Sequence, residues 1–460
     1  MMPKRPEDWQ KRRVVVVGMA RSGQSVCKLL AEHGAEVTGT DLRSPDVLKL
    51  DLESMAHQHI RLVLGQHPLD LLDDCDVLIV SPGVPKKAPF LQEAERRGIP
   101  RISEIEVASQ FLDQPIAATT GTNGKSTTTQ LVGDVANALG MKTAVAGNIG
   151  WPLSDVVDED FDAISLELSS YQLEDIVKFK PHVAALLNVT PDHLDRYRNL
   201  DHYRETKERI FENQDEHDMA LLPSHESWDD LAARLVAKVY RFGASEVITQ
   251  GAVIREDGLV WREHSLDHSV LAWEDFPLMG QHNRENAAAA LGLLIGLGVE
   301  ASNPKLGEAF AKARALPHRM EPAGVHKGVR FINDSKATNP ESLEVALESF
   351  EGDVVLIAGG QAKEADYSTL VPSLEKCVKG VVLIGEARDD LAKAWSRLQV
   401  PMQDMGTDLQ AAVSRAAELA APKGVVLFSP GCASFDMFQD YEQRGDRFKS
   451  YVRAFLGDVS

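Results

Sequence analysis

Short apolar runs that end in glycine or polar residues recur along the chain. The first, RVVVVG at residues 13–18, is continuously apolar, which predicts a buried parallel strand running into a glycine turn. Residues 22–33 carry apolar positions at helical spacing, and further strands are predicted at residues 36–40 and 76–80. This alternation of strand and helix predicts a doubly wound α/β unit that closes near Phe111.

A second strand–loop–helix pattern begins at Pro115 with the segment IAATTGTNGKSTTTQLV. The segments AVAGNIG, DAISLELSS and VAALLNVTPDHLDRY follow it, and each is an apolar run that ends in polar residues. Ligand sites in open α/β sheets lie at the carboxyl ends of the strands, so these polar ends are expected to carry chemistry. Residues 215–280 contain short alternating runs such as GLVWRE, which indicate a small antiparallel addition.

The last third of the chain repeats the α/β pattern. Strands are predicted at VRFIND, DVVLIAGG, GVVLIG and GVVLFSP, with helical stretches between them, which favours a mostly parallel sheet. Because 460 residues exceed what one hydrophobic core usually organises, we predict an α/β protein of three domains. The predicted domains are residues 1–112, 113–315 and 316–460.

The charge balance argues against one class of partner. With 49 basic and 69 acidic residues the formal net charge is -20, whereas proteins that wrap nucleic acid need lysine and arginine to neutralise phosphates. A single phosphorylated metabolite stays compatible, since backbone amides and a few cations can hold it. The four cysteines lie far apart without a CxxC pair, and no apolar run approaches the roughly 18 residues of a membrane span. We expect a soluble, cytoplasmic monomer without nucleic-acid or membrane partners.

The segment GTNGKST follows an apolar strand and opens a helix, the context in which backbone amides and a helix N-terminus cradle phosphates. Lys125 is expected to neutralise the outer phosphates of ATP, and the Ser126 hydroxyl to face magnesium. The match to the Walker A pattern is incomplete, because Thr119 stands where its first glycine belongs, and a plain strand-to-helix turn with a surface lysine is the alternative. The predicted ATP-binding residues of this loop are Gly121, Thr122, Asn123, Gly124, Lys125, Ser126 and Thr127.

The first domain contains a related turn. Gly18-x-Ala20-x-x-Gly23 resembles a dinucleotide-binding turn whose middle glycine is replaced, and Asp41 lies at the tip of the next strand, where a ribose or base would arrive. Alanine at the middle position hinders the close approach of a pyrophosphate, so a nucleotide sugar is favoured over a nicotinamide cofactor. A turn that serves only helix–sheet packing is the alternative.

Magnesium needs oxygen ligands, and candidate ligands should follow the strands next to the phosphate loop. Glu167 and His193 both come just after buried strands. Imidazole prefers softer metals, so Asp192 and Asp195 are alternative ligands, and a helix-capping Glu167 or a packed His193 is equally compatible with the pattern. Lys207 lies in DHYRETKERIFEN, where a solvated helix face is the default interpretation.

A series of motifs occurs in the order seen in one enzyme family. They are TGTNGKST, GNIG, LELSSYQLE, NVTPDHLDRY, GQHNRENAAAA, LPHRME, NDSKATNPES, GGQAKEAD and SPGCASFDMFQDYEQRG. Over nearly its full length the chain thereby resembles the Mur ligases. The resemblance implies a Rossmann-like N-terminal domain for a UDP moiety, a central P-loop-type ATPase domain, and a C-terminal domain of dinucleotide-binding type that binds an amino acid.

The resemblance also implies a reaction. ATP-dependent ligation of D-glutamate to UDP-N-acetylmuramoyl-L-alanine would pass through an acyl phosphate, form ADP and phosphate, and serve peptidoglycan precursor synthesis. The catalytic residues it implies are Lys125, Glu167, His193 and Lys207. Two Mg²⁺ sites are implied, with the ligands Ser126, Glu167, His193 and Lys207, the last as a carbamate.

Substrate-binding residues are carried over in the same way. Further ATP-binding residues are Asn283, Asn286, His318, Arg319 and Asp334. The UDP-substrate residues are Arg21, Ser22, Asp41, Leu42, Ser81, Gly83 and Asn148, and the D-glutamate residues are Thr338, Lys363, Ser434 and Tyr441. The chain departs from the family pattern at Leu42, where a threonine is usual, at Tyr441, where a phenylalanine is usual, and in GGQAK, where GGDGK is usual.

Other interpretations are weighed against this one. Another amide ligase of the superfamily, such as the L-alanine-adding or diaminopimelate-adding Mur ligase or a folylpolyglutamate synthase, is disfavoured by the NDSKATN and SPGCAS loops. A regulatory or scaffold protein that binds nucleotide without catalysis is disfavoured by Glu167, His193 and Lys207. The hypothesis of an NAD-dependent oxidoreductase is supported only by the segment from Gly18 to Asp41.

Overall fold

The computed structural model describes residues 3, 5–192, 196–264, 266–362 and 365–457. These residues form three sheets flanked by helices, so the α/β fold class is confirmed. The chain divides into two compact units, Met1–Asp275 with Glu285–Ala311 and Phe276–Arg284 with Lys312–Ser460. The domain boundaries expected near residues 112 and 315 stay predictions. Within the described ranges, no helix is long and apolar enough to cross a membrane.

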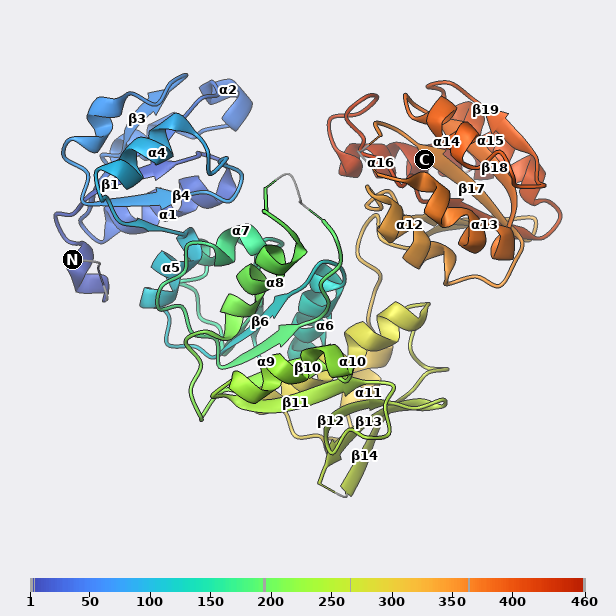
Figure 1. The fold of residues 1–460 in the computed structure, drawn as a ribbon, viewed down its shortest axis with the longest axis horizontal. Helices are drawn as coiled ribbons and strands as arrows, with labels where there is room; N and C mark the ends of the chain where they lie inside the picture. Colours follow the sequence, from blue (N-terminus) through green and yellow to red (C-terminus); the bar gives the residue numbers. More distant parts are fainter. Residues whose placement is uncertain (1–2, 4, 193–195, 265, 363–364, 458–460) are drawn as a thin grey trace. The chain divides into compact units, whose positions relative to one another are not determined.

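The first sheet is wholly parallel, with the strand order β3-β2-β1-β4-β5 (blue in Figure 1). Its strands are β1 (Arg13–Val17), β2 (Glu36–Asp41), β3 (Arg61–Leu64), β4 (Val77–Val80) and β5 (Arg101–Ile102). The helices of this region are α1 (Arg21–Glu32), α2 (Pro45–Leu48), α3 (Leu52–His57), α4 (Pro89–Arg96) and α5 (Glu104–Ala108). The predictions of β1, β2, β4 and α1 are confirmed, whereas the sequence pattern does not predict the short edge strands β3 and β5.

Both faces of β1 are covered, which explains its unbroken apolar sequence. Val16 packs in one apolar cluster with Val26 of α1, and Val17 packs in another with Phe90 of α4. Successive side chains of a strand point to opposite faces, so a strand between two helical layers needs apolar residues at every position.

The second sheet contains nine strands in the order β14-β13-β12-β11-β10-β9-β6-β8-β7. They are β6 (Ile116–Thr120), β7 (Thr143–Gly147), β8 (Ala163–Glu167), β9 (Val183–Leu186), β10 (Met219–Pro223), β11 (Lys238–Gly243), β12 (Gln250–Ile254), β13 (Gly258–Glu263) and β14 (Leu266–Ala272). The accompanying helices are α6 (Lys125–Ala138), α7 (Ser170–Leu173), α8 (Leu200–Glu208), α9 (Asp229–Arg234), α10 (Gln281–Gly296) and α11 (Leu306–Ala311). Strands β12, β13 and β14 pair antiparallel, which confirms the predicted addition around GLVWRE, and the other neighbours pair parallel.

Small residues let helix α10 lie directly on this sheet. A Cβ atom added at Gly292 would lie 2.5 Å from the Leu221 side chain of β10, and one at Gly296 would lie 2.5 Å from Val183 of β9. Because interiors are close-packed, a larger side chain at either glycine would push the helix outward. This packing fixes the position of Asn286 on the same helix.

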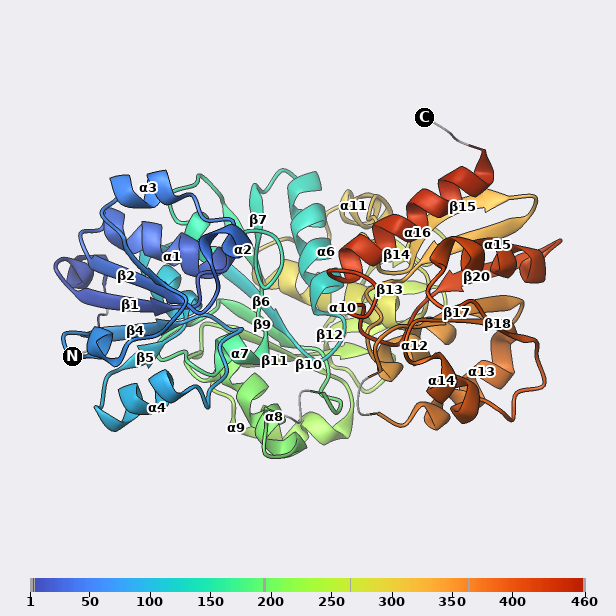
Figure 2. The same ribbon diagram turned by 90° about the horizontal axis from the view of Figure 1, so that it is seen from above.

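The third sheet has the order β15-β16-β20-β17-β18-β19 and is parallel except for the β15–β16 pair. Its strands are β15 (Glu321–His326), β16 (Val329–Asn333), β17 (Val354–Gly359), β18 (Val378–Ile384), β19 (Met402–Asp404) and β20 (Gly424–Phe428). Its helices are α12 (Pro340–Leu347), α13 (Val371–Cys377), α14 (Arg388–Ala394), α15 (Leu409–Ala420) and α16 (Tyr441–Leu456), of which α15 and α16 pack together (Figure 2). The four predicted strands are confirmed, and the edge strands β15 and β19 are additional to them.

A buried carboxylate fastens helix α5 to the segment that follows α7. Glu106 is 2% exposed, and its two oxygens accept hydrogen bonds from the backbone N–H groups of Val177, Lys178 and Phe179 at 2.8–3.0 Å. Hydrogen bonds to an ionised acceptor are about twice as strong as neutral ones, so this contact ties the first sheet's last helix to the second sheet's surroundings.

We predict that Glu106→Gln lowers the free energy of unfolding by about 2 kcal/mol, because the amide offers one acceptor oxygen and turns its NH₂ group toward backbone donors. Urea titration followed by circular dichroism measures the loss. The control, Glu95→Gln at an exposed position of α4, should change stability by less than about 0.5 kcal/mol. Equal effects of the two substitutions would contradict the anchoring role of Glu106.

Candidate nucleotide and ligase site

The predicted phosphate loop lies between the end of β6 and the start of α6. Gly124 precedes the helix with a φ of 86°, in the left-handed region that favours glycine. The side-chain oxygen of Asn188, beyond β9, accepts hydrogen bonds from the backbone N–H groups of Thr122 and Asn123 at 3.1 and 2.9 Å. The residue that follows a neighbouring strand thus fixes the loop at the N-terminus of a helix, which is a favourable place for phosphate.

Two lysines converge on one carbonyl of this loop. Lys125 Nζ donates to Gly121 O at 2.8 Å, and Lys207 Nζ donates to the same oxygen at 2.7 Å. Lys207 is 1% exposed, so its default interpretation as part of a solvated helix face is wrong. Burial, and then the charge of Lys125, hold the pKa of Lys207 well below its usual value. A buried amine with a lowered pKa is available in its uncharged, nucleophilic form.

Glu167 ends strand β8 beside the loop. It is 1% exposed, and Asn148 Nδ2 donates to its Oε1 at 2.7 Å, while Oε2 has no hydrogen-bond partner among the described residues. The helix-capping alternative for Glu167 is wrong, because Ser169 caps α7 in a capping box with Gln172. A buried carboxylate oxygen without a donor fits a hard cation such as magnesium.

Of the remaining predicted magnesium ligands, some belong to the described residues and others do not. Ser126 is buried at the start of α6, and Asp192 is close enough for its charge to raise the pKa of Lys207. His193 and Asp195 lie outside the described residues. Among the residues that are described, no group of three or more histidine, cysteine, aspartate or glutamate side chains is arranged to hold a metal. Magnesium here would therefore depend on hydroxyl, carboxylate and substrate oxygens.

The first sheet brings two predicted substrate residues, Asp41 and Ser81, to its carboxyl edge. Asp41 Oδ2 accepts the Met19 backbone N–H at 2.8 Å, and Ser81 Oγ donates to Gly18 O at 2.6 Å. Burial by itself raises the pKa of Asp41, but hydrogen bonds from Arg43 and from the amides of Arg43 and Met19 outweigh it and lower the pKa to about 2. Asp41 is therefore an ionised hydrogen-bond acceptor at physiological pH.

The other predicted substrate residues surround this edge. Arg21 Nη2 donates to Gly150 O at 2.9 Å, which links the start of α1 to the loop that carries Asn148. Leu42 is 65% exposed and a Cβ atom added at Gly83 would meet nothing within 4 Å, so both positions face open space. The structure also places Ser22, half-buried, in the first turn of α1.

Asn283 and Asn286 are buried residues in the first turns of α10. Asn283 Nδ2 donates to Met279 O at 2.6 Å. Asn286 Oδ1 accepts from Thr128 Oγ1 at 3.4 Å, and a Cβ atom added at Gly124 would lie 2.4 Å from the same oxygen. Asn286 therefore packs directly on the phosphate loop, and its assignment to ATP stays a prediction.

In the second unit, His318 and Arg319 form a polar corner. The backbone of His318 lies at a φ of 63°, which residues other than glycine adopt rarely, and its Nδ1 lies 3.0 Å from Asn333 Nδ2. Burial, followed by the charge of Lys449, lowers the pKa of His318 and favours the neutral ring. Arg319 has a buried Nε atom that no described residue pairs with.

Asp334 lies close to this corner. Its oxygens accept hydrogen bonds from the Met320 backbone N–H at 3.1 Å and from Ser429 Oγ at 2.7 Å. Burial raises the pKa of Asp334 to about 6, against the opposing effect of these donors. The structure therefore groups two of the predicted ATP residues, His318 and Asp334, around the Met320 segment.

Three loops of the second unit meet where D-glutamate is predicted to bind. Gln361 in GGQAK and Ala433 in SPGCAS exchange backbone hydrogen bonds at 2.9 and 3.0 Å, and Gly431 N–H donates to Ala337 O of NDSKATN at 2.9 Å. Of the predicted residues on these loops, Ser434 is buried and Thr338 is half-buried.

The remaining predicted D-glutamate residues are Tyr441 and Lys363. Tyr441 lies edge-on to His318, with ring centroids 6.2 Å apart, at the start of α16. The predicted amino-acid and nucleotide residues are thus neighbours at this position. Lys363 lies outside the described residues.

Sequence reasoning missed a residue that holds these loops together. Arg444 is fully buried, and its guanidinium donates to Ser335 O, Ser335 Oγ, Cys432 O and Ala433 O at 2.8–3.1 Å. Burial lowers the pKa of Arg444 to about 10. Its position in the YEQRG motif is the only available sequence signal, because helical spacing does not reveal which loops a side chain reaches.

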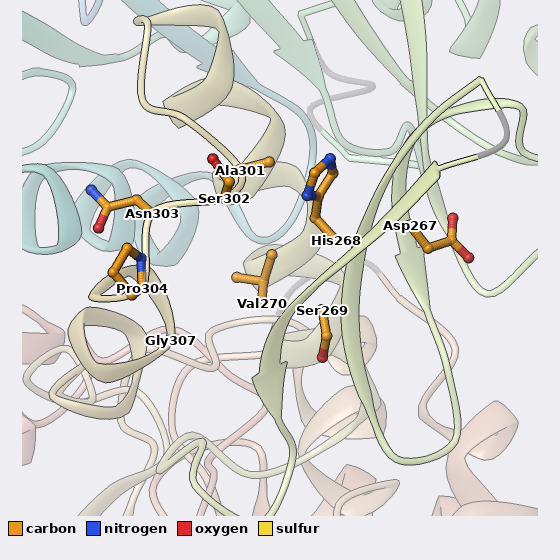
Figure 3. A pocket seen from close by; sticks show the side chains of 9 residues that line it. All are labelled: Asp267, His268, Ser269, Val270, Ala301, Ser302, Asn303, Pro304 and Gly307. Atoms are coloured by element: carbon orange, nitrogen blue, oxygen red, sulfur yellow. The ribbon is translucent and has the colours of Figure 1, made fainter.

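A separate hollow of about 400 Å³ lies between β14 and the segment before α11 (Figure 3). Its lining includes His268, Val270 and Ser302, and contains none of the predicted site residues. In the described chain, none of the buried polar atoms without a partner belongs to its lining.

A glycine-containing phosphate loop between a buried strand and a helix, beside a buried lysine and carboxylate, defines a nucleotide-binding α/β protein of the P-loop type. Three family models match the chain: the Mur ligase MurD-like N-terminal domain over residues 12–103, the Mur ligase middle domain over 119–294, and the Mur ligase glutamate ligase domain over 318–432. The chain belongs to the Mur ligase family.

Individual relatives and solved structures are also similar to this chain. The UDP-N-acetylmuramoylalanine–D-glutamate ligase of Geobacter metallireducens is 44% identical over 96% of this chain and 97% of its own, and that of Koribacter versatilis is 39% identical over 97% and 98%. Among solved structures, UDP-N-acetylmuramate-alanine ligase MurC of Thermotoga maritima is 20% identical, with coverage of 96% and 99% and a TM-score of 0.60. MurF of Acinetobacter baumannii is 17% identical, with coverage of 95% and 93% and a TM-score of 0.61. Structures at these identities share the fold.

We predict that Gly124→Ala weakens ATP binding at least about tenfold, because the added methyl combines a strained φ with a clash against Asn286. Isothermal titration calorimetry measures the affinity. Gly140→Ala is a matched control, since Gly140 has a φ of 91° but open space around it, so this substitution should cost about 1 kcal/mol of stability and leave ATP affinity unchanged. Equal ATP affinity in the two variants would contradict the proposed packing of the loop.

Proposed function

We propose that the protein joins D-glutamate to UDP-N-acetylmuramoyl-L-alanine, consuming ATP and releasing ADP and phosphate, as a step in making peptidoglycan precursors. The observation that carries the proposal is the convergence of Lys125, Lys207 and the buried Glu167 at the phosphate loop. It is supported by the 44% identical relative named for this reaction, whose length the chain spans almost completely. We further propose that the protein is a cytoplasmic monomer.

The proposed reaction has two chemical steps. The acceptor carboxylate attacks the terminal phosphorus of ATP, the bond to ADP breaks, and an acyl phosphate forms. The amine of D-glutamate then attacks the acyl carbon, and the tetrahedral intermediate loses a proton and expels inorganic phosphate. Lys125 and the backbone amides of the loop offset negative charge on the transferring group, which is the main contribution a protein makes to phosphoryl transfer.

Magnesium, when bound, supplies positive charge that offsets the phosphate oxygens. We propose that Ser126 and Glu167 hold it in the described part of the chain, with His193 and a carbamate on Lys207 completing two sites. The unpaired Glu167 oxygen supports this assignment, because a buried carboxylate oxygen needs a donor or a cation. Asn148 positions the same carboxylate through its other oxygen.

Lys207 is proposed to carry a carbamate. An uncharged lysine amine can add to the carbon of CO₂ and lose a proton, which converts the neutral amine into an anionic carbamate. Burial beside Lys125 favours this outcome, since it lowers the pKa of the Lys207 amine and places a cation next to the anion that forms.

The three substrates are assigned to different groups of residues. Asp41 and Ser81, with Arg21, Ser22, Leu42, Gly83 and Asn148, are proposed to bind the UDP-linked acceptor. Asn283, Asn286, His318, Arg319 and Asp334 are proposed to bind ATP beyond its phosphate loop. Thr338, Lys363, Ser434 and Tyr441 are proposed to bind D-glutamate, because a dicarboxylate needs hydroxyl donors and a cation to replace its hydration.

The purified protein should release phosphate from ATP only when UDP-N-acetylmuramoyl-L-alanine and D-glutamate are both present. A coupled phosphate assay with a panel of amino acids that includes L-glutamate measures this requirement, and mass spectrometry identifies the new amide. Lys125→Ala should reduce the rate at least about 100-fold, because the transferring phosphate loses its cation. Phosphate release without amide formation, or full activity of Lys125→Ala, would contradict the proposed function.

Activity should depend on dissolved CO₂. Enzyme depleted of CO₂ under inert gas should lose ligation activity and regain it when bicarbonate is added, because the carbamate forms from CO₂. Lys207→Arg should be at least about 100-fold slower and insensitive to bicarbonate, since a guanidinium stays charged. The control is Lys142→Arg at an exposed side chain, which should keep both the rate and the bicarbonate response. Activity that is independent of CO₂ in the wild type would contradict the carbamate.

A further inference from the structure

A buried ion pair connects the two ends of the first unit's proposed site. Arg196 Nη2 and Nε donate to the two carboxylate oxygens of Glu174 at 2.6 and 3.2 Å. The Arg196 side chain is 15% exposed and that of Glu174 is 2% exposed. Lys86 Nζ also lies 3.2 Å from Glu174 Oε2. Such a two-point pair has a defined geometry as well as a charge, so it fixes the position of whatever it holds.

Arg196 has a third contact, to the loop after β4. Its Nη1 donates to the backbone carbonyl of Val84 at 3.3 Å. Val84 belongs to the segment of residues 81–86, called here the 81–86 loop, which also carries Ser81 and Gly83 of the proposed acceptor site. Through Val84 and Lys86, this loop is therefore held by a pair of residues that follow strands β8 and β9 of the second sheet.

The other face of Arg196 leads to the phosphate loop. Its guanidinium lies 4.1 Å from the ring centre of Tyr171, and Tyr171 stacks on Tyr197. Tyr197 contacts Tyr203 with ring centres 5.0 Å apart, and Lys207 Nζ lies 4.5 Å from the Tyr203 ring. A continuous row of aromatic rings thus joins the ion pair to the lysine beside Gly121, and packed rings transmit position because interiors do not compress.

We infer that Arg196 is a positioning residue for the acceptor: with Glu174 it sets the 81–86 loop relative to the phosphate loop, so that the acceptor carboxylate meets the terminal phosphate of ATP. The inference rests on the proposed function. Alignment of reacting groups is a large part of such catalysis, and an error of about 1 Å can cost on the order of 100-fold in rate. Sequence position gives Arg196 no such role, since it acts through Val84, 112 residues away.

The competing explanation is that the Arg196–Glu174 pair only stabilises the fold. The chain contains a second ion pair that serves as a matched control. Arg101 of β5 pairs with Asp175, the residue next to Glu174, with Nη2 and Oδ1 2.9 Å apart and side-chain exposures of 27% and 13%. This pair also joins the first sheet's region to the segment after α7, but among the described residues neither side chain forms a hydrogen bond or ion pair with the 81–86 loop.

The test compares two double variants, Arg196→Gln with Glu174→Gln, and Arg101→Gln with Asp175→Asn. Each removes one ion pair without leaving a buried charge unpaired, which limits loss of folding. The first should raise KM and Kd for UDP-N-acetylmuramoyl-L-alanine at least about tenfold and leave KM for ATP within about twofold. The second should leave all three constants within about twofold. Arg196→Lys keeps the positive charge but loses the two-point hydrogen bonding of the guanidinium, so it should raise the acceptor KM about threefold.

Several outcomes would overturn the inference. They are an unchanged acceptor Kd in the first double variant, an ATP KM that rises in step with the acceptor KM, or the same change in the Arg101 and Asp175 variant. The acceptor Kd is measured by calorimetry without turnover, so the inference is judged separately from the reaction. A wild type that binds the acceptor without ligating D-glutamate refutes the proposed function, and the Kd difference still decides the role of Arg196; a wild type that does not bind it refutes both.

Discussion

The site depends on a backbone bend that only glycine accommodates without strain. At Gly124 the chain turns at a φ of 86° into helix α6, while the Asn286 side chain lies where a methyl group would be. Beside the bend, the side-chain oxygen of Asn188 accepts hydrogen bonds from the Thr122 and Asn123 amides and fixes the loop. Lys125 and Lys207 both donate to Gly121 O of this loop, and Asn286 packs on Gly124.

The second feature of the site is buried charge, which is explained by the neighbouring phosphate loop. Lys207 and Glu167 are each 1% exposed, which would be costly in an ordinary core. Next to a loop that is proposed to bind phosphate and magnesium, the same desolvation is useful. It lowers the pKa of the lysine amine, and one Glu167 oxygen has no hydrogen-bond partner among the described residues. Glu106, by contrast, is buried with its oxygens hydrogen-bonded to backbone donors.

In the second unit, loops carry the residues that are proposed to bind D-glutamate. GGQAK, SPGCAS and NDSKATN all follow parallel strands, so their polar ends meet at one edge of the third sheet. Loops of this kind are poorly ordered unless something fixes them, and Arg444 does so by donating to backbone carbonyls of two of them. The proposed glutamate pocket is thereby organised by a residue that need not touch the amino acid.

Sequence alone determined the features whose cause is local. A continuous apolar run fixes β1 as a buried strand, and GTNGKST after an apolar strand fixes a phosphate loop, because neighbours in the chain act on one another whatever the tertiary fold. The edge strands β3, β5 and β19 were not predicted because few residues carry their pattern, and β15 was not predicted because EPAGVH is only partly buried and contains proline and glycine. Only the tertiary structure decided that Lys207 is buried, that Asn188 holds the loop, and that Arg196 reaches Val84. The hydrogen bonds from Asn123 to Asn188, from Lys207 to Gly121 and from Arg196 to Val84 join residues 65 to 112 positions apart, and residue spacing holds no information about them.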